Sequence, residues 1–212
     1  MAEQFSIPIA IPGHPGVYLK DYDIYRVINA QKMGRCIAMR KLDLLAVPDK
    51  YFYRIGDSWR VLVEHVEGDA NPPLLSLPVV QQLTILTEET GYRDWGWANW
   101  VFGVQGKFKG KFVCRDMELA SFGTLVNGGC IDPTTGTKAA FVEGVLQYKN
   151  VMEPKALQWL QGRIAELQKS PAGLAKSLTL VSSTQFDDPE IDSATVKNHY
   201  SGNGGRYCDY QE

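Results

Sequence analysis

The sequence predicts an α+β fold, built mostly of antiparallel β-sheet in a sandwich- or barrel-like form with about two helices packed on it. Apolar residues recur at helical spacing in only two segments, near residues 78–90 and 154–169. Residues 21–67 and 92–151 instead contain aromatic and β-branched runs separated by turn-forming glycine, asparagine and aspartate. The 212 residues, 44% of them hydrophobic and 22% charged, are typical of a globular chain with one substantial core.

Composition divides the chain into an arm, a domain and a second arm. Residues 1–18 are rich in proline and glycine and are expected to be extended, because proline fixes φ and restricts the residue before it. Residues 19–185 are expected to form the single α+β domain. Residues 186–212 contain six acidic and two basic residues, a net charge of −4, and predict a flexible acidic C-terminal arm.

Both expected helices carry sequence signals at their ends. Pro78 suits the first turn of the first helix, and Gly91 can end it. Pro154 has the same place in the second helix. The apolar stripe of the second helix consists of Leu157, Leu160, Ile164 and Leu167.

Two strand pairs are expected in the domain. The first is a hairpin that turns at Gly56-Asp57, with Trp59, Val61 and Val63 on one face. The second lies within the aromatic-rich residues 94–114.

In residues 94–114 the apolar side chains fall on even positions and the lysines on odd positions. A three-residue loop at 105–107 keeps one face of the hairpin apolar, whereas a two-residue turn would mix lysines with aromatics on the same face. This loop pairs Trp100 with Phe112, Phe102 with Gly110 and Val104 with Phe108. The predicted core residues are therefore Trp100, Phe102, Val104, Phe108 and Phe112.

Trp95 and Trp97 do not follow this parity. Without a bulge they lie on the outer face near the lysines, and with a bulge at Ala98-Asn99 they turn into the core. Both alternatives are open from the sequence. An outward pair of tryptophans would be a stacking platform of the kind used by single-stranded nucleic-acid binders.

Candidates for catalysis are few. The sequence contains no nucleotide-binding glycine loop, nucleophile elbow or zinc-protease motif. The remaining constellation is Cys130 in "NGGCIDP", with His199 or His65 as the base. The four cysteines are widely spaced without a CxxC pair, so neither a metal nor another cofactor is expected.

The sequence favours a non-enzymatic structural or assembly protein, a subunit of a homo-oligomer or larger particle such as a virion-like assembly or a multiprotein complex. Tyr207 and Tyr210 lie in an otherwise polar terminus, and tyrosine anchors suit docking onto another subunit. The terminal arms are the expected contacts with neighbours.

Two other functions stay open. One is a single-stranded nucleic-acid-binding module that uses Trp95 and Trp97 with Lys107, Lys109 and Lys111, although the net charge of −2 disfavours it. The other is a hydrolase or transferase that depends on Cys130. No apolar run is long enough to cross a bilayer and the first residues do not resemble a signal peptide, so a cytoplasmic location without membrane contact is expected.

Overall fold

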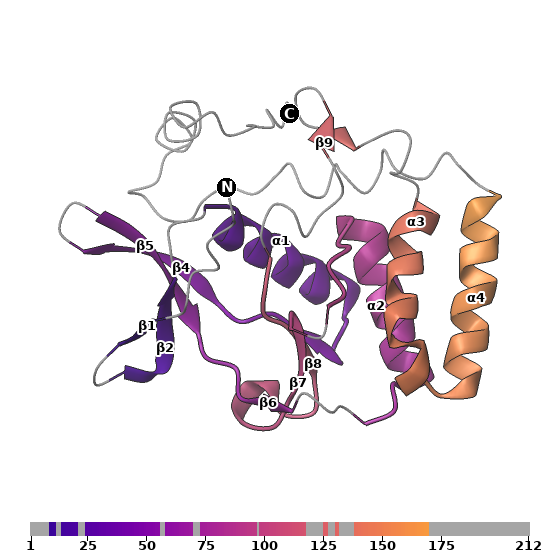
Figure 1. Cartoon of the computed structure of the whole chain (residues 1–212), viewed down its shortest axis with the longest axis horizontal. Helices are drawn as coiled ribbons and strands as arrows, with labels where there is room; N and C mark the ends of the chain where they lie inside the picture. Colours follow the sequence, from indigo (N-terminus) through magenta and orange to yellow (C-terminus); the bar gives the residue numbers. More distant parts are fainter. Residues whose placement is uncertain are drawn as a thin grey trace.

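In the computed structural model, a group of helices lies at one end of the molecule and a β-sheet projects at the other, with a long helix and a second sheet between them (Figure 1). The residues that the structure describes are 9–11, 14–20, 24–55, 58–69, 73–96, 98–117, 125–126, 130–131 and 138–169.

The first sheet, called here the projecting sheet, has four antiparallel strands in the order β1-β2-β5-β4. Its strands are β1 (Ile9–Ile11), β2 (His14–Lys20), β4 (Lys50–Ile55) and β5 (Ser58–Glu64). Ile55 pairs with Ser58, which confirms the hairpin expected around residues 56 and 57. Strands β1 and β2 come from the segment predicted as an extended arm, and β2 pairs with β5.

The second sheet, called here the central sheet, has the order β3-β8-β7-β6. Its strands are β3 (Leu45–Ala46), β6 (Gly68–Asp69), β7 (Trp100–Gly103) and β8 (Phe112–Cys114). The β3 strand runs parallel to β8, and the other pairs are antiparallel. Two further short strands, β9 (Leu125–Val126) and β10 (Cys130–Ile131), pair antiparallel with each other.

The mixed α+β content and the mostly antiparallel strands agree with the predicted fold class. Among the described strands neither four-stranded sheet closes into a barrel, because each order has two different strands at its ends.

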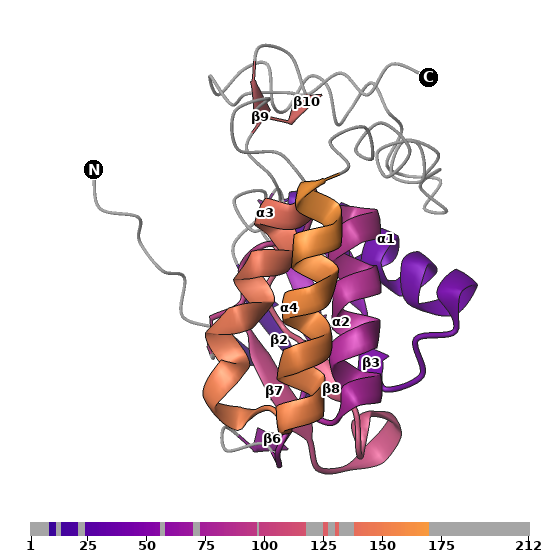
Figure 2. The same cartoon turned by 90° about the vertical axis from the view of Figure 1, so that its right-hand side faces the viewer.

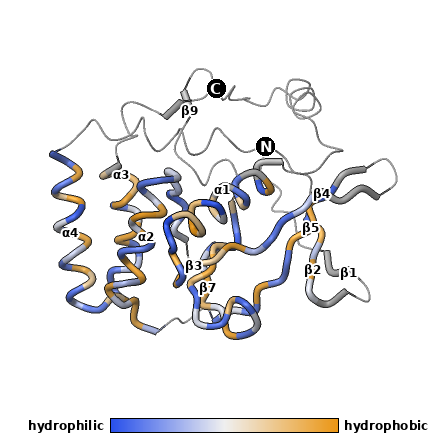
Figure 3. The backbone as a smooth tube through the Cα atoms, turned by 180° about the vertical axis from the view of Figure 1, so that it is seen from behind, coloured by the Kyte–Doolittle hydropathy of each residue, from blue (hydrophilic) through white to orange (hydrophobic). Residues whose placement is uncertain are grey.

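Two helices lie where the sequence predicts them. Helix α2 (Leu77–Thr90) has proline in its first turn and ends at Gly91, whose left-handed φ of 71° suits glycine and whose N–H bonds to the carbonyl of Thr87. Helix α4 (Pro154–Gln168) begins at its proline. Its hydrophobic residues alternate with hydrophilic ones along the chain, as expected of a helix with one buried face (Figure 3).

Helix α1 (Ile24–Arg40) corrects the prediction that residues 21–67 form mostly strands. Val27, Ala30 and Met33 recur at a spacing of three and are buried. This spacing fits one helix face. Alanine and methionine are weak signals of an apolar stripe, however, and the β-branched and aromatic residues of the same segment favour a strand prediction.

A second correction concerns residues 138–151, which were expected as strand. They form helix α3 (Lys138–Glu143) and a 3₁₀-helix, η3 (Gly144–Val151). Gly144 lies where the two meet, and a Cβ atom there would be 2.5 Å from the indole ring of Trp95. The glycine therefore permits helix and indole to approach closely.

The main core lies between helices α2, α3 and α4, which lie side by side in Figure 2, and the central sheet behind them. Its centre is aromatic. Trp100 stacks between Trp95 and Phe112, with ring centroids 5.1 Å apart in each pair. Tyr92 and Tyr148 meet this stack edge-on. All five residues are almost completely buried.

The register of the β7–β8 hairpin differs from the prediction by two residues. Trp100 pairs with Cys114 and Phe102 with Phe112, so the connection is longer than three residues and contains the 3₁₀ turn η1 (Gly106–Phe108). The shift keeps Trp100 and Phe112 in the main core, whereas Phe108 packs in a separate cluster with Val101 and Val113. Consequently Trp100, Phe108 and Phe112 are buried as predicted and Phe102 is half-buried, but Val104 is 41% exposed because it lies in the connection.

Two alanine substitutions are expected to change stability in opposite directions. In Gly103→Ala the new Cβ would lie 2.2 Å from the carbonyl oxygen of Phe108, so the free energy of unfolding should fall by about 1–3 kcal/mol. Gly162 faces open space on α4, and Gly162→Ala should raise the free energy of unfolding by about 0.5–1 kcal/mol. Urea unfolding followed by circular dichroism measures both, and a free energy of unfolding that does not fall in Gly103→Ala would contradict the packing of Gly103.

Candidate functional site

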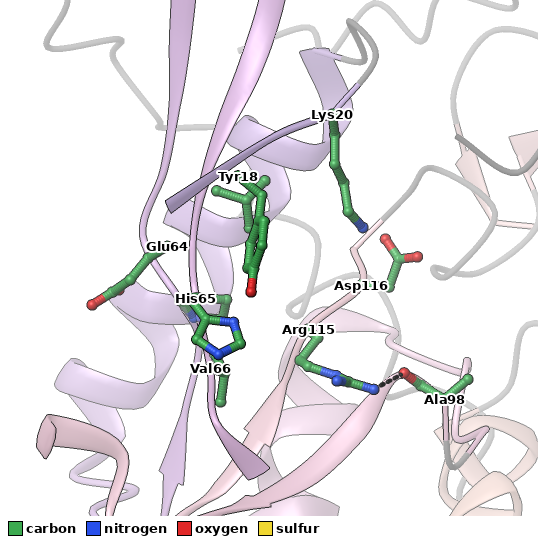
Figure 4. Close-up of a pocket in the computed structure, with 10 residues that line it drawn as sticks. Tyr18, Lys20, Glu64, His65, Val66, Ala98, Arg115 and Asp116 are labelled. Atoms are coloured by element: carbon green, nitrogen blue, oxygen red, sulfur yellow. Dashed lines mark hydrogen bonds between the residues drawn. The ribbon is translucent and has the colours of Figure 1, made fainter. Parts of the chain in front are cut away.

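A pocket of about 430 Å³ opens where the projecting sheet meets the central sheet, and it is called here the junction pocket. Its volume is within the range of ligand sites, roughly 300–1,000 Å³. Strand β2 contributes Tyr18 and Lys20, while Arg115 and Asp116 follow β8 directly (Figure 4). The pocket therefore depends on how the two sheets are placed against each other.

One wall of the junction pocket is aromatic and apolar. The rings of Tyr18 and His65 meet edge to face with centroids 4.9 Å apart. Pro48, Val63 and Val66 extend this wall. A ligand here would gain contact with rings and aliphatic carbon on one side.

The other wall is charged. Lys20 and Arg115 are its cations, and Arg115 donates a hydrogen bond of 2.7 Å to the carbonyl of Ala98. The carboxylate of Asp116 accepts a bond of 2.6 Å from Arg26, which lies outside the lining.

The second carboxylate of the lining is Glu64. Its side chain forms an ion pair of 2.9 Å with Lys107, which is also outside the lining. Partial burial opposes the charge of Lys107, but hydrogen bonds to Asp49 and Glu64 prevail and raise the pKa of this lysine. Each carboxylate of the pocket is thus paired with a cation from outside the lining, and Lys107 is shared between Glu64 and Asp49.

Lys50 lies behind this charged wall and is 3% exposed. Its Nζ donates a hydrogen bond of 2.8 Å to the carbonyl of Arg115. Burial lowers the pKa of Lys50 to about 7, and the nearby carboxylate of Asp116 opposes this only in part. The bond links β4 of the projecting sheet to the residue that follows β8.

Further hydrogen bonds fix the segment after β8. Asn29 donates to the carbonyl of Met117 at 2.9 Å, and the hydroxyl of Tyr92 donates to the carbonyl of Asp116 at 3.2 Å. The Met117 N–H donates to the Asp116 carboxylate at 3.0 Å. Arg115 and Asp116 are therefore held on a backbone anchored to α1 and to the core.

Of the candidate catalytic residues, only His65 lies at a described pocket. Cys130 is in the short β9–β10 pair, and His199 lies outside the described residues. The pairing of Cys130 with His199 or His65 therefore stays a prediction. Burial raises the pKa of the Cys114 thiol to about 12, and burial with the nearby Glu89 raises that of Cys36 to about 11, which disfavours the nucleophilic thiolate at both.

The candidate binding residues are distributed over very different environments. Trp95 is fully buried in the core, so it has no ring face open to a base. Lys107 is ion-paired, as described above, Lys109 is exposed and Lys111 is half-buried. Trp97, Tyr207 and Tyr210 lie outside the described residues.

A groove of about 520 Å³ lies between α2 and α4, lined by Ile85 and Trp159 among others. Arg163 bonds there to both carboxylate oxygens of Glu88, each at 2.8 Å. Because this pair already satisfies the main charges of the groove, the junction pocket is the stronger candidate site.

The described residues contain no group of three or more histidine, cysteine or acidic side chains placed to hold a metal ion. In the same part of the chain, no helix has both the length and the apolar character needed to cross a membrane.

Sequence reasoning missed Tyr18, Lys20, Arg115 and Asp116 as site residues. They are separated by about a hundred positions and follow no recognisable spacing. The available signal was the alternation in β2 and β5, which places Tyr18 and Lys20 on one face.

Comparison with known proteins does not assign the site. No protein-family model matches the sequence. No curated protein is significantly similar to it.

Proposed function

We propose that this chain is a non-enzymatic assembly protein, a subunit of a homo-oligomer or larger particle formed in the cytoplasm, either virion-like or a multiprotein complex. It contacts its neighbours through the N-terminal segment of residues 1–18 and the C-terminal segment of residues 186–212. The observation that carries this proposal is the projecting sheet, whose outer strands are β1 and β4.

Outer strands are sites for association. A strand at the edge of a sheet presents unpaired backbone groups that can pair with a strand of another chain. Strand β1 belongs to the N-terminal segment, and the side chain of Tyr51 on β4 is 56% exposed. Exposed tyrosines are enriched among the anchors of protein interfaces.

The packing beneath the projecting sheet also supports association. Among the described side chains, the apolar cluster between this sheet and α1 consists of Val27, Val61 and Val63. The main cluster of the molecule is far larger and lies at the other end. A second chain that covers this sheet would add to its stability.

Light scattering after size-exclusion chromatography tests the proposal on the full chain and on a variant without residues 187–212. We expect the full chain to form oligomers and the shortened variant to be smaller. Tyr51→Lys should weaken self-association by about tenfold or more, whereas Tyr51→Phe, which keeps the ring, should not. A full chain that stays monomeric at its highest soluble concentration would refute the proposal.

A further inference from the structure

The groove between α2 and α4 runs along two parallel helices, which lie side by side in Figure 2. Leu75 and Met152 form a parallel bridge just before the two helices begin, so both helices start at the same end. Ile85 and Gly162 are each the ninth residue of their helix and therefore lie at the same level. The groove, about 520 Å³ in volume, is open to a third segment that follows both helices.

The lining of the groove presents apolar surface. Ile85 is 38% exposed and Trp159 is half-buried. An apolar side chain placed over these two residues would remove their exposed carbon from water, which is favourable in proportion to the area covered.

The polar groups of the lining are largely satisfied within it. The hydroxyl of Thr84 donates a hydrogen bond of 2.8 Å to the carbonyl of Val80. The guanidinium of Arg163 donates to Glu88 at 2.8 Å and to Glu166 at 3.2 Å. An apolar occupant can therefore cover the groove without separating these groups from their partners.

The chain leaves α4 at one end of this groove. Glu166 belongs to the lining, and α4 ends two residues later at Gln168. Residues 170–183, called here the return segment, read "SPAGLAKSLTLVSS" and lie outside the described residues. They contain no acidic residue, so they bring no like charge to the two carboxylates of the groove.

The return segment has the pattern of a helix with one apolar face. Leu174, Leu178 and Val181 recur at spacings of four and three, which places them on one side of a helix. Lys176 and Thr179 fall on the opposite side. Pro171 suits the beginning of such a helix, because proline is favoured in a first turn.

The lengths of groove and segment agree. Trp159 and Glu166 are seven residues apart on α4, as are Leu174 and Val181 in the return segment, and each pair spans about 10 Å along a helix. Residues 169–173 form a connection of the length that joins antiparallel helices, about two to five residues. With this connection, Leu178 comes level with Gly162 and hence with Ile85.

We propose that residues 174–181 dock as a helix in the α2–α4 groove of their own copy, antiparallel to α4. Leu178 contacts Ile85, and Val181 contacts Trp159. The short connection to α4 favours the same copy, because it gives the segment a high effective concentration at the groove. The docked helix ties the start of the C-terminal segment, residues 186–212, to the helical end of the molecule. This contact does not depend on the proposed assembly function.

Amide hydrogen exchange of the full chain tests the docking, measured by mass spectrometry on fragments that cover residues 177–181. In the docked helix these amides are hydrogen-bonded. They should therefore exchange at least about tenfold more slowly than in a free peptide of residues 170–185. Exchange at the rate of the free peptide would overturn the proposal.

Substitutions on both partners tie this protection to the groove. Leu178→Asp should remove it, whereas Thr179→Asp, the same charge on the opposite side of the helix, should keep it. Ile85→Lys should remove it as well, whereas Met39→Lys, at an exposed apolar residue of α1, should not. Ile85→Lys combined with Leu178→Asp should restore part of the protection, because opposite charges then meet. Equal protection in all these variants would show that the segment docks elsewhere.

Dilution distinguishes docking within one copy from docking between copies. Protection should be constant over a roughly hundredfold range of protein concentration, because the contact is intramolecular. Loss of protection on dilution would place the segment on a second copy and overturn the proposal. A chain that is monomeric in light scattering but keeps the protection refutes the assembly function alone, and an oligomeric chain without protection refutes the docking alone.

Discussion

Trp95→Ala is expected to lower the free energy of unfolding by about 3–5 kcal/mol. The indole of Trp95 is fully buried, stacks on Trp100 at 5.1 Å and meets Tyr92 edge-on at 5.2 Å. Its removal leaves a cavity between the helices and the central sheet, and these elements cannot move together far enough to fill it. Urea unfolding followed by circular dichroism measures the loss.

Trp159→Ala is the matched control. Trp159 lies on α4 and is only partly buried, so the same change should cost about 1–2 kcal/mol. An unchanged urea midpoint in Trp95→Ala, together with loss of binding to single-stranded nucleic acid, would contradict the core position and favour a stacking platform.

Lys50 is expected to make stability depend on pH in the neutral to alkaline range. Burial lowers the pKa of Lys50 to about 7 in the folded chain, against 10.5 for an ordinary lysine. Above pH 7 the folded chain releases this proton while the unfolded chain keeps it. The unfolded chain then binds more protons, so the contribution of Lys50 to stability rises with pH by about 1.4 kcal/mol per pH unit up to about pH 10.

Comparison with Lys50→Met isolates this contribution. The buried thiols of Cys36 and Cys114 have raised pKa values and lower stability as pH rises above about 8.5, but they do so in both chains. The free energy of unfolding of the native chain minus that of Lys50→Met should therefore rise between pH 7 and about 10 and be flat below pH 6. A constant difference across this range would show that the Lys50 ammonium is solvated in the folded chain.

The helices show what the sequence could and could not predict. Helix α4 was predictable because four large aliphatic residues recur at helical spacing after Pro154, and nothing else competes with that pattern. Helix α1 was not, because its buried face combines Val27 with small or flexible residues such as Ala30 and Met33. The end of α3 could not be predicted, because Gly144 resembles a turn residue in its local sequence. In the structure this glycine allows the close packing of Trp95.

The β7–β8 hairpin shows a different limit. Side-chain parity placed Trp100 and Phe112 together in the core, but pairings that differ by two residues share that parity, and it did not predict that Val101 and Val113 on the other face are buried as well. The observed register depends on Phe108, whose backbone lies against Gly103. This contact forms within a 3₁₀ turn that no hairpin rule anticipates.

The junction pocket could not be predicted because it is formed by tertiary placement. Tyr18 and His65 meet across β2 and β5, whereas Arg115 is positioned by Lys50 through its backbone carbonyl. Such pairs are distant in sequence and have no characteristic spacing. The alternation in β2 and β5 gave a hint, because it places Tyr18 with Lys20 on one face and His65 on the face of Val63.

The parallel pairing of β3 with β8 has a consequence for the order in which the protein can form during synthesis. Leu45 pairs with Phe112, so the central sheet cannot be completed until the chain has been extended through Cys114. The projecting sheet needs only the residues up to Glu64. On the ribosome the strands of the projecting sheet are therefore complete before the body of the molecule exists, and this sheet can form first.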